Sequence, residues 1–398
     1  MLEGKMMNGN LIGLIDPKPG STVLICDVHA SESGALAILT DLYHQICAYE
    51  DKSVTWVMAV SIPRYPSEGN VIVERYPWAK RNWAYRYYFD TVIVRRILKK
   101  HHPDQVVSLQ NSGLPFYAGR QIVYLHQALF LTRHRMDVRK DGLKLWLYQN
   151  VISKMAFRSL KKADVTVVQT RWMQEALANQ AGIPPERIIL QQPDISGNGI
   201  GQYRDTPENR KRFFYPATGM AYKNHMTLLR ALQYARDKGL QDYELVLTIR
   251  PTENAYTKML YAYAGQWGLN VIFGGQISRE QVFELYTRST LVFPSCVESF
   301  GLPLLEARMT GSPVIASDTP FCREILAGYE KACFFRELDH VSLGEWLLKT
   351  VNNELEDGGY EPICRIARCG DCPDPVARPG DPGTVLKTVC PGGGCGNE

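Results

Sequence analysis

The sequence predicts an α/β protein built from two doubly wound parallel sheets, one after the other along the chain. Short apolar runs alternate with longer amphipathic stretches, as is typical of parallel sheets whose strands are joined by helices. The alternation pauses at residues 192–207, which are rich in Pro, Gly, Asn and Asp, and then restarts. A polar break of this composition indicates a linker between two domains.

The first half contains six apolar runs of strand length, separated in most cases by helical patterns such as Ala35–Tyr49 and Tyr85–Lys100. The runs are Thr22–Cys26, Val54–Val60, Gln105–Leu109, Ile122–Leu125, Val165–Gln169 and Ile188–Gln191. We therefore expect an N-terminal Rossmann-like domain over residues 1–195, followed by a linker over 196–207.

The second half repeats the pattern and predicts a second Rossmann-like domain over residues 208–355. Its expected strands are Phe213–Tyr215, Glu244–Ile249, Val271–Phe273, Leu291–Phe293, Val314–Ala316 and Cys333–Phe335. Its expected helices are Asn224–Lys238, Ala255–Trp267, Glu280–Ser289, Pro303–Met309 and Leu343–Asn352. Open sheets of this kind bind ligands beyond the carboxyl ends of their strands, so two domains facing a cleft can share one ligand.

The end of the chain differs in composition. Residues 361–398 include 7 Gly, 6 Pro and 5 Cys but no aromatic residue, so we expect 356–398 to form an atypical, disordered tail. Alternatively, the pair Cys369 and Cys372 and the more loosely spaced pair Cys390 and Cys395 are zinc ligands. A shifted reading frame would also produce such a tail. Cysteines in apolar runs elsewhere, among them Cys26, are expected to be reduced and buried.

Composition excludes several classes of protein. The chain has 398 residues, of which 45% are hydrophobic and 22% charged, which excludes wholesale disorder and fibrous structure. No apolar run approaches the length of a membrane-spanning helix, and Leu11–Ile15 is too short for the core of a signal peptide. We therefore expect a cytoplasmic protein.

Charge is distributed unevenly along the chain. The net charge is +4, but the segment from Arg75 to Lys162 has 18 Lys and Arg against 4 Asp and Glu, a local net charge of +14. Such a segment indicates a phosphate-bearing ligand or an anionic membrane surface as partner, or else a solvated basic face. Nucleic acid is not expected, because the usual nucleic-acid-binding motifs are missing.

The most informative segment surrounds Glu298 and Glu306, which stand eight residues apart. Between them, Gly301 and Pro303 are suited to the start of a helix, whose free N–H groups and dipole attract a phosphate. The two carboxylates are then placed to hold hydroxyls on either side of a bound diphosphate. Alternatively, the two glutamates are only a capping residue and an exposed residue of the helix.

This segment resembles the family-4 glycosyltransferases, retaining enzymes of the two-domain GT-B fold. The positions in register are Pro294, Ser295, Glu298, Phe300, Gly301, Leu302, Pro303, Glu306, Ala307, Gly311, Pro313 and Val314. The resemblance extends roughly from Val23 to Asn352 and is nearest to bacterial enzymes of surface-polysaccharide synthesis. It implies transfer of a sugar from a nucleotide-sugar donor to a glycan or lipid-linked acceptor, with retention of anomeric configuration.

The resemblance also assigns roles in donor binding. Glu306 would bind the ribose hydroxyls and Glu298 the hydroxyls of the donor sugar. The backbone of Phe300, Gly301 and Leu302 would hold the sugar and the diphosphate. No metal or other cofactor is implied, because no Asp-x-Asp stands in a suitable loop.

Three further positions are expected in the site by the same resemblance. Lys223 would pair with the diphosphate, Gly34 would let the backbone approach the donor phosphate or the acceptor, and His126 would lie beside the donor sugar and the leaving phosphate. The family usually has an arginine where this chain has Met220, and Arg250 is a weak candidate to replace it.

The basic segment falls in the acceptor-side domain, and the family's acceptors are often lipid-linked. Two stretches, Tyr76–Tyr88 and Leu143–Lys162, mix cations with aromatic or apolar residues and suit an anionic lipid surface at the inner face of the cell membrane. The alternative for Leu143–Lys162 is an amphipathic helix packed on the sheet. Three other functions stay open at this point: a catalytically impaired relative acting as a scaffold, a sugar-nucleotide epimerase, and a zinc or nucleic-acid module.

Overall fold

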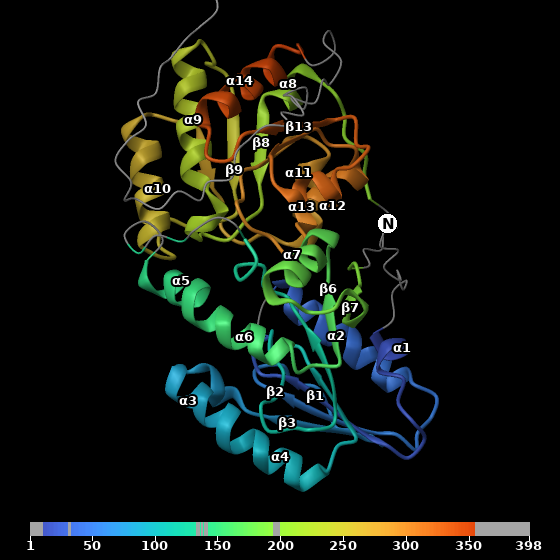
Figure 1. The fold of residues 1–398 in the computed structure, drawn as a ribbon. Coiled ribbons are helices and arrows are strands. Elements are labelled where there is room, and N and C mark those ends of the chain that lie inside the picture. Colours follow the sequence, from blue (N-terminus) through green and yellow to red (C-terminus); the bar gives the residue numbers. More distant parts are fainter. Residues whose placement is uncertain are drawn as a thin grey trace, which may run out of the picture. The chain divides into compact units, whose positions relative to one another are not determined.

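The computed structural model describes residues 11–30, 33–132, 136, 138, 142–193 and 200–354, and the expected tail with its cysteines lies outside these ranges. Each half of the described chain forms a parallel sheet with helices on both faces, which confirms the predicted α/β class (Figure 1). Cys26 and Cys296 are buried thiols, as expected. Within the described ranges no helix combines the length and apolar character needed to cross a membrane.

The first sheet has seven strands in the order β3-β2-β1-β4-β5-β6-β7, and all neighbouring strands are parallel. The strands are β1 (Thr22–Asp27), β2 (Thr55–Val60), β3 (Val71–Arg75), β4 (Gln105–Ser108), β5 (Arg120–Tyr124), β6 (Val165–Val168) and β7 (Ile188–Leu190). The central strands are continuously buried, which explains their unbroken apolar runs. The strand order reverses between β1 and β4.

Strand β3 was not predicted from the sequence. It lies at the edge of the sheet, and of its five residues only Val71 is buried. Its remaining positions include Glu74 and Arg75, so the stretch lacks the apolar run that marked the inner strands.

The helices of the first half pack on both faces of its sheet. They are α1 (Leu11–Ile15), α2 (Ser33–Ala48), η1 (Pro77–Lys80), α3 (Trp83–Tyr88), η2 (Phe89–Ile93), α4 (Val94–His101), α5 (Leu143–Leu147), η3 (Tyr148–Ile152), α6 (Ser153–Leu160), α7 (Arg171–Ala181) and η4 (Pro185–Arg187). The helix expected at Tyr85–Lys100 begins earlier, because the side chain of Asn82 caps it by accepting from the amides of Ala84 and Tyr85. It is also interrupted by the π-helical turn η2, and the turn η3 interrupts α5–α6 in the same way.

The second sheet has six parallel strands in the order β10-β9-β8-β11-β12-β13. The strands are β8 (Arg212–Tyr215), β9 (Glu244–Leu247), β10 (Val271–Phe273), β11 (Thr290–Phe293), β12 (Val314–Ser317) and β13 (Ala332–Phe335). The helices are α8 (Pro207–Arg210), η5 (Ala221–Lys223), α9 (His225–Asp237), α10 (Ala255–Gln266), α11 (Arg279–Tyr286), α12 (Leu302–Thr310), α13 (Pro320–Ile325) and α14 (His340–Val351). Figure 1 shows α9, α10 and α14 on one side of β8 and β9, and α11, α12 and α13 on the other.

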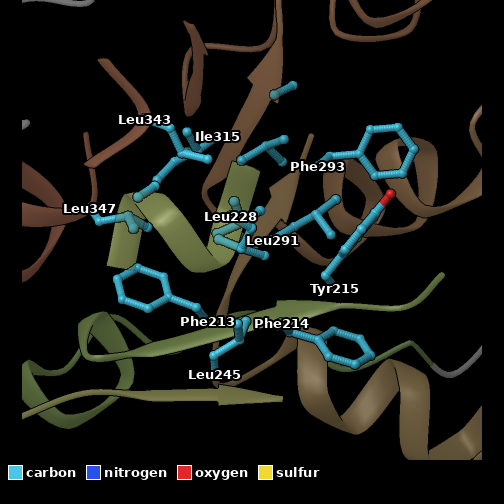
Figure 2. Close-up of a cluster of buried hydrophobic side chains, with 14 of the residues drawn as sticks. Phe213, Phe214, Tyr215, Leu228, Leu245, Leu291, Phe293, Ile315, Leu343 and Leu347 are labelled. Atoms are coloured by element: carbon cyan, nitrogen blue, oxygen red, sulfur yellow. The ribbon is translucent and has the colours of Figure 1, made fainter. Parts of the chain in front are cut away.

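The core of the second half lies around strands β8 and β11 (Figure 2). Leu343 and Leu347 of α14 extend the same cluster. At its far end the ring of Tyr215 meets that of Phe293 edge to face, with centroids 5.6 Å apart. This contact joins the carboxyl ends of β8 and β11, the two strands between which the order of the second sheet reverses.

Candidate active site

The candidate site lies where the strand order of the second sheet reverses, at the carboxyl ends of β8 and β11. The connection after β8 contains η5, which ends at Lys223, and the loop after β11 carries Glu298. In open α/β sheets the two loops at such a point diverge to opposite faces and leave a crevice for a ligand. Two residues far apart in sequence are therefore brought to one edge of the sheet.

Lys223 and Glu298 form a nearly buried ion pair. Their Nζ and Oε1 atoms are 2.5 Å apart, and each side chain is only 15% exposed. The hydroxyl of Ser295 also donates to Glu298 Oε1, at 2.8 Å, and the Tyr215 hydroxyl donates to the Lys223 carbonyl, at 2.8 Å. Burial alone would lower the pKa of Lys223, but the Glu298 carboxylate overcomes this effect and raises that pKa, so the lysine is a fixed cation.

The start of α12 offers free amide groups beside this pair. Gly301 precedes the helix with a φ of 93°, and a Cβ atom there would lie 3.0 Å from the Leu304 side chain, so the position needs glycine. Among the described residues no side chain caps the helix, and Pro303 occupies its first turn, as expected. Phe300 is buried in the core and anchors the loop, and Leu302 is the first helical residue. An uncapped N-terminus of this kind attracts an anion.

Glu306 lies inside α12 and is 6% exposed. Its two carboxylate oxygens have separate partners. Arg279, at the start of α11, approaches Oε1 to 3.3 Å, and the Tyr286 hydroxyl donates to Oε2 at 3.2 Å. Burial raises the pKa of Glu306 despite the opposing effects of Arg279 and Tyr286. The carboxylate is thus held in a fixed position by two side chains of α11.

In the first half, His126 follows β5 at the carboxyl edge of its sheet. Its backbone amide donates to Oδ1 of Asn111 at 2.7 Å, and its ring stacks on Tyr124 with centroids 4.3 Å apart. Burial lowers the pKa of His126 to about 4, so the ring is neutral at pH 7. Among the described residues its buried Nε2 atom has no hydrogen-bond partner. Gly34 is the second residue of α2, the helix that follows β1.

The structure therefore brings some of the expected site residues together and leaves others apart. Lys223 and Glu298 are in contact, and Phe300, Gly301, Leu302 and Glu306 continue the same loop and helix. Within the described part of the chain, no hydrogen bond or ion pair joins His126 to Lys223 or Glu298.

Met220, which stands where the family usually has an arginine, is 38% exposed. The side chain of Arg250, the candidate to replace that arginine, packs against Gly275, after β10.

Several residues that hold the site were not predicted. Ser295 belongs to the matched motif, and its spacing of three from Glu298 was a usable signal for a hydrogen bond. Arg279 and Tyr286 come from another helix, and Asn111 comes from another strand connection. Nothing in the local sequence of these three residues indicates which carboxylate or amide they contact.

The loop that carries Glu298 also contacts the first half of the chain. The hydroxyl of Thr170, just after β6, donates to the Ser299 carbonyl at 2.9 Å. The Glu324 carboxylate of α13 accepts from the amides of Arg171 and Trp172, at 2.7 and 3.0 Å, and so caps helix α7. The loop after β11 is thus tied to the end of the first sheet.

Comparisons with known proteins match each half of the chain to a glycosyltransferase family model. Residues 51–191 match the family described as Glycosyltransferase Family 4, and residues 202–357 match the family described as Glycosyl transferases group 1. A curated relative, the O-antigen chain mannosyltransferase RfbU of Salmonella typhimurium, is 24% identical over 211 residues. That alignment spans 50% of this chain and 57% of the relative, so it reaches little more than half of that protein.

Solved structures show the same fold. Sucrose-phosphate synthase from Thermosynechococcus elongatus matches with a TM-score of 0.60 and 15% identity, over 84% of this chain and 93% of that one. HepE of Anabaena, solved in complex with UDP and glucose, matches with a TM-score of 0.59 and 15% identity, over 84% and 91%. The two family matches together run from residue 51 to residue 357 with a gap only at 192–201. The chain belongs to the family-4 glycosyltransferases of GT-B fold.

Proposed function

We propose that this protein transfers a sugar from a nucleotide-sugar donor to a hydroxyl group of a glycan or lipid-linked acceptor, with retention of anomeric configuration. The observation that carries the proposal is the Lys223–Glu298 pair beside the uncapped start of α12, at the switch point of the second sheet. Family membership supports the same reaction class, and the complex of HepE with UDP and glucose supports a nucleotide-sugar donor.

Each charged group has a distinct task in donor binding under this proposal. The diphosphate sits on the free amides at Gly301 and Leu302, where the helix dipole and the Lys223 ammonium offset its negative charge. Glu306 accepts hydrogen bonds from the ribose hydroxyls. Glu298 accepts from hydroxyls of the donor sugar, which requires it to share its carboxylate between the sugar and Lys223.

The chemical step needs no covalent enzyme intermediate. The bond from the sugar anomeric carbon to the diphosphate oxygen breaks, and a bond from that carbon to the acceptor oxygen forms on the same face. The acceptor proton passes to the departing diphosphate. Negative charge grows on the diphosphate as its bond breaks, and fixed dipoles with a buried cation stabilise charge most where water is excluded. Lys223 and the α12 amides are the groups suited to this role.

A surface of the first half suits a lipid-linked acceptor at an anionic membrane. Four apolar side chains spaced by four residues lie on the run of α5, η3 and α6, and they are 39–64% exposed; they are Leu143, Leu147, Val151 and Met155. Exposed Lys154, Arg158, Lys161 and Lys162 follow on the same segment. An apolar stripe bordered by cations is the pattern of a helix that lies in the interface of an anionic bilayer. We therefore propose peripheral membrane docking through this stripe.

Release of nucleoside diphosphate from a panel of UDP-, GDP- and ADP-sugars tests the function. GDP-mannose and UDP-glucose come first, because one relative is named a mannosyltransferase and one structural relative was solved with UDP and glucose. We expect slow hydrolysis of one donor by the wild type and its loss in Glu306→Ala. Glu284→Ala is the matched control, because Glu284 is an exposed glutamate on neighbouring α11.

The alternatives give different results in the same assay. Donor binding without release would support a catalytically impaired relative. Conversion of the donor sugar to its epimer would support an epimerase. Failure of every donor to bind would contradict the proposal.

A further inference from the structure

An exposed arginine stands beside the buried Glu306 carboxylate. Arg279 is the first residue of α11, and its Nη2 atom is 3.3 Å from Oε1 of Glu306. The Arg279 side chain is 58% exposed, whereas that of Glu306 is 8% exposed. Among the described residues Glu306 is the only ion-pair partner of Arg279. That contact engages one end of the guanidinium, and its other N–H groups are left for a ligand.

The two carboxylate oxygens of Glu306 have different surroundings. Oε2 accepts from the hydroxyl of Tyr286, which is fully buried in the core of the second half. Oε1 is the atom beside the exposed Arg279. A ligand that reaches Glu306 from solvent must therefore lie on the Oε1 side, next to the guanidinium.

The position of Glu306 in α12 orders the parts of a bound nucleotide. Under the proposed function the diphosphate binds at Gly301 and Leu302, and the ribose binds at Glu306, four residues further along the helix than Leu302. At 1.5 Å per residue this is about 6 Å along the helix axis. The base is attached at the opposite end of the ribose from the diphosphate. It therefore lies beyond the ribose hydroxyls, next to the exposed group that flanks Glu306, which is Arg279.

Phe283 restricts the orientation of the Arg279 guanidinium. This residue follows Arg279 by one helical turn, and the Cζ atom of Arg279 is 5.2 Å from the centroid of its ring. A guanidinium that lies over a ring and is paired at one end has lost much of its freedom. Its remaining N–H groups are thus preorganised for the edge of a planar ligand.

We propose that Arg279 contacts the base of the donor nucleotide and selects guanine. The guanine edge carries two adjacent acceptors, O6 and N7, which match two N–H groups of a guanidinium. Adenine places an amino donor beside its N7, and uracil places N3–H beside its O4, so each offers only one acceptor to the same group. The inference rests on the proposed function and adds to it the class of donor, a GDP-sugar.

Two other roles for Arg279 predict a different result. Arg279 could serve only to hold Glu306, or it could add positive charge near the diphosphate. In either case its substitution would weaken the binding of every nucleoside diphosphate equally, because all of them share the ribose and the diphosphate. A residue that contacts the base changes the preference among bases instead.

Binding of nucleoside diphosphates to the full-length protein tests the inference without turnover. The probes are GDP, UDP, ADP and 7-deaza-GDP, in which a C–H group replaces N7, and isothermal titration calorimetry gives each Kd. Arg279→Lys keeps the positive charge beside Glu306 but removes the paired N–H groups. Arg288→Lys is the matched control, because Arg288 follows the same helix, is 44% exposed and also pairs with a glutamate at 3.3 Å.

We expect the wild type and Arg288→Lys to bind GDP about tenfold or more tightly than UDP, ADP or 7-deaza-GDP. In Arg279→Lys we expect these ratios to fall to about 1, mainly through weaker binding of GDP.

Four results would overturn the inference and leave the proposed function in place. They are a wild type that prefers another base, equal affinities for GDP and 7-deaza-GDP, an unchanged GDP preference in Arg279→Lys, and an equal loss of affinity for all four nucleotides in that variant. Failure of all four to bind the wild type would overturn the proposed function as well.

Discussion

The two halves of the chain share one strand order over six strands, but they differ in whether the polar groups at their switch points are paired. At the switch point of the second sheet, Lys223 and Glu298 satisfy each other at 2.5 Å. At the switch point of the first sheet, Asp27 keeps one buried carboxylate oxygen without a hydrogen-bond partner among the described residues. The same topology therefore carries a self-paired ion pair in one half and an unpaired buried carboxylate oxygen in the other.

The difference follows from the charges at each point. The Lys223 ammonium and the Glu298 carboxylate offset each other, so this cation is in place before a ligand arrives. Oδ2 of Asp27 has no such partner among the described residues, and burial raises the pKa of Asp27 to about 6. Preorganised charge of the first kind is what the proposed sugar transfer needs.

We expect the largest effect from loss of the Lys223 cation. Lys223→Met removes the charge that offsets the diphosphate and leaves Glu298 nearly buried and unpaired. We expect kcat to fall about 10²- to 10³-fold and the free energy of unfolding to fall by about 3 kcal/mol. Donor turnover and urea unfolding measure the two effects.

Lys211→Met is the control for this change. Lys211 pairs with Asp242 at 2.6 Å, but its side chain is 36% exposed and that of Asp242 is 80% exposed. We expect at most about 1 kcal/mol of destabilisation and unchanged turnover. Equal effects of the two substitutions would contradict a special role for Lys223.

The exposed apolar stripe on α5, η3 and α6 lies in the first half. A charge placed on this stripe should therefore weaken membrane binding, whereas a charge on the second half should not. Met155 is 64% exposed on α6, and Met155→Glu puts an anion against the lipid headgroups. We expect binding to phosphatidylglycerol vesicles to weaken about tenfold, measured by co-sedimentation. Met259→Glu is the matched control, because Met259 is 48% exposed on α10 in the second half. Equal weakening by both would show that docking does not use the stripe.

Buried histidines should make both halves sensitive to acid. His225, at the start of α9, is fully buried, and burial together with Lys223 lowers its pKa to about 3. At a pH below 6.5, the ordinary pKa of histidine, the unfolded chain therefore binds a proton at His225 that the folded chain excludes. Stability is retained above that pH and falls toward pH 3, by up to about 1.4 kcal/mol per pH unit for each such histidine. Asp27, whose pKa is raised to about 6, acts with the opposite sign.

His225→Phe removes an imidazole that takes up a proton on unfolding. It therefore tests directly whether His225 lowers stability in acid. We expect the free energy of unfolding to change less between pH 6.5 and pH 4.5 than in the wild type, by at most about 3 kcal/mol. Urea unfolding at the two pH values measures this. A substituted protein with the wild-type pH dependence would show that His225 does not set the acid limit.

The smallest expected effect concerns the contact between the halves. Glu324→Gln weakens the carboxylate cap on the amides of Arg171 and Trp172. We expect about 1 kcal/mol of destabilisation, measured by urea unfolding. Glu330→Gln, at an exposed position after α13, should change stability by less than about 0.5 kcal/mol. Indistinguishable stabilities of the two variants would mean that the cap contributes nothing.

The sequence was sufficient for most of the fold, because buried parallel strands are continuous apolar runs. It was insufficient for β3, an edge strand in which only Val71 is buried, and for helix α13, which spans only six residues. The turns η2 and η3 were also missed, because a π-helical turn has no periodic signature of its own.

The sequence likewise predicted only part of the candidate site. Glu298, Glu306 and Lys223 were identified through a motif and a loop position. The contact between Lys223 and Glu298 spans 75 residues and exists only because β8 and β11 are neighbours. Arg279 and Asp27 belong to no motif, and tertiary structure alone shows what they face.

A crystal structure of the protein with the nucleoside diphosphate of its donor tests the central claim most directly. We predict the diphosphate on the amides of Gly301 and Leu302 within reach of Lys223 Nζ, with the ribose on Glu306. A diphosphate bound at the first sheet, or a nucleotide without contact to Lys223 and Glu306, would contradict the account.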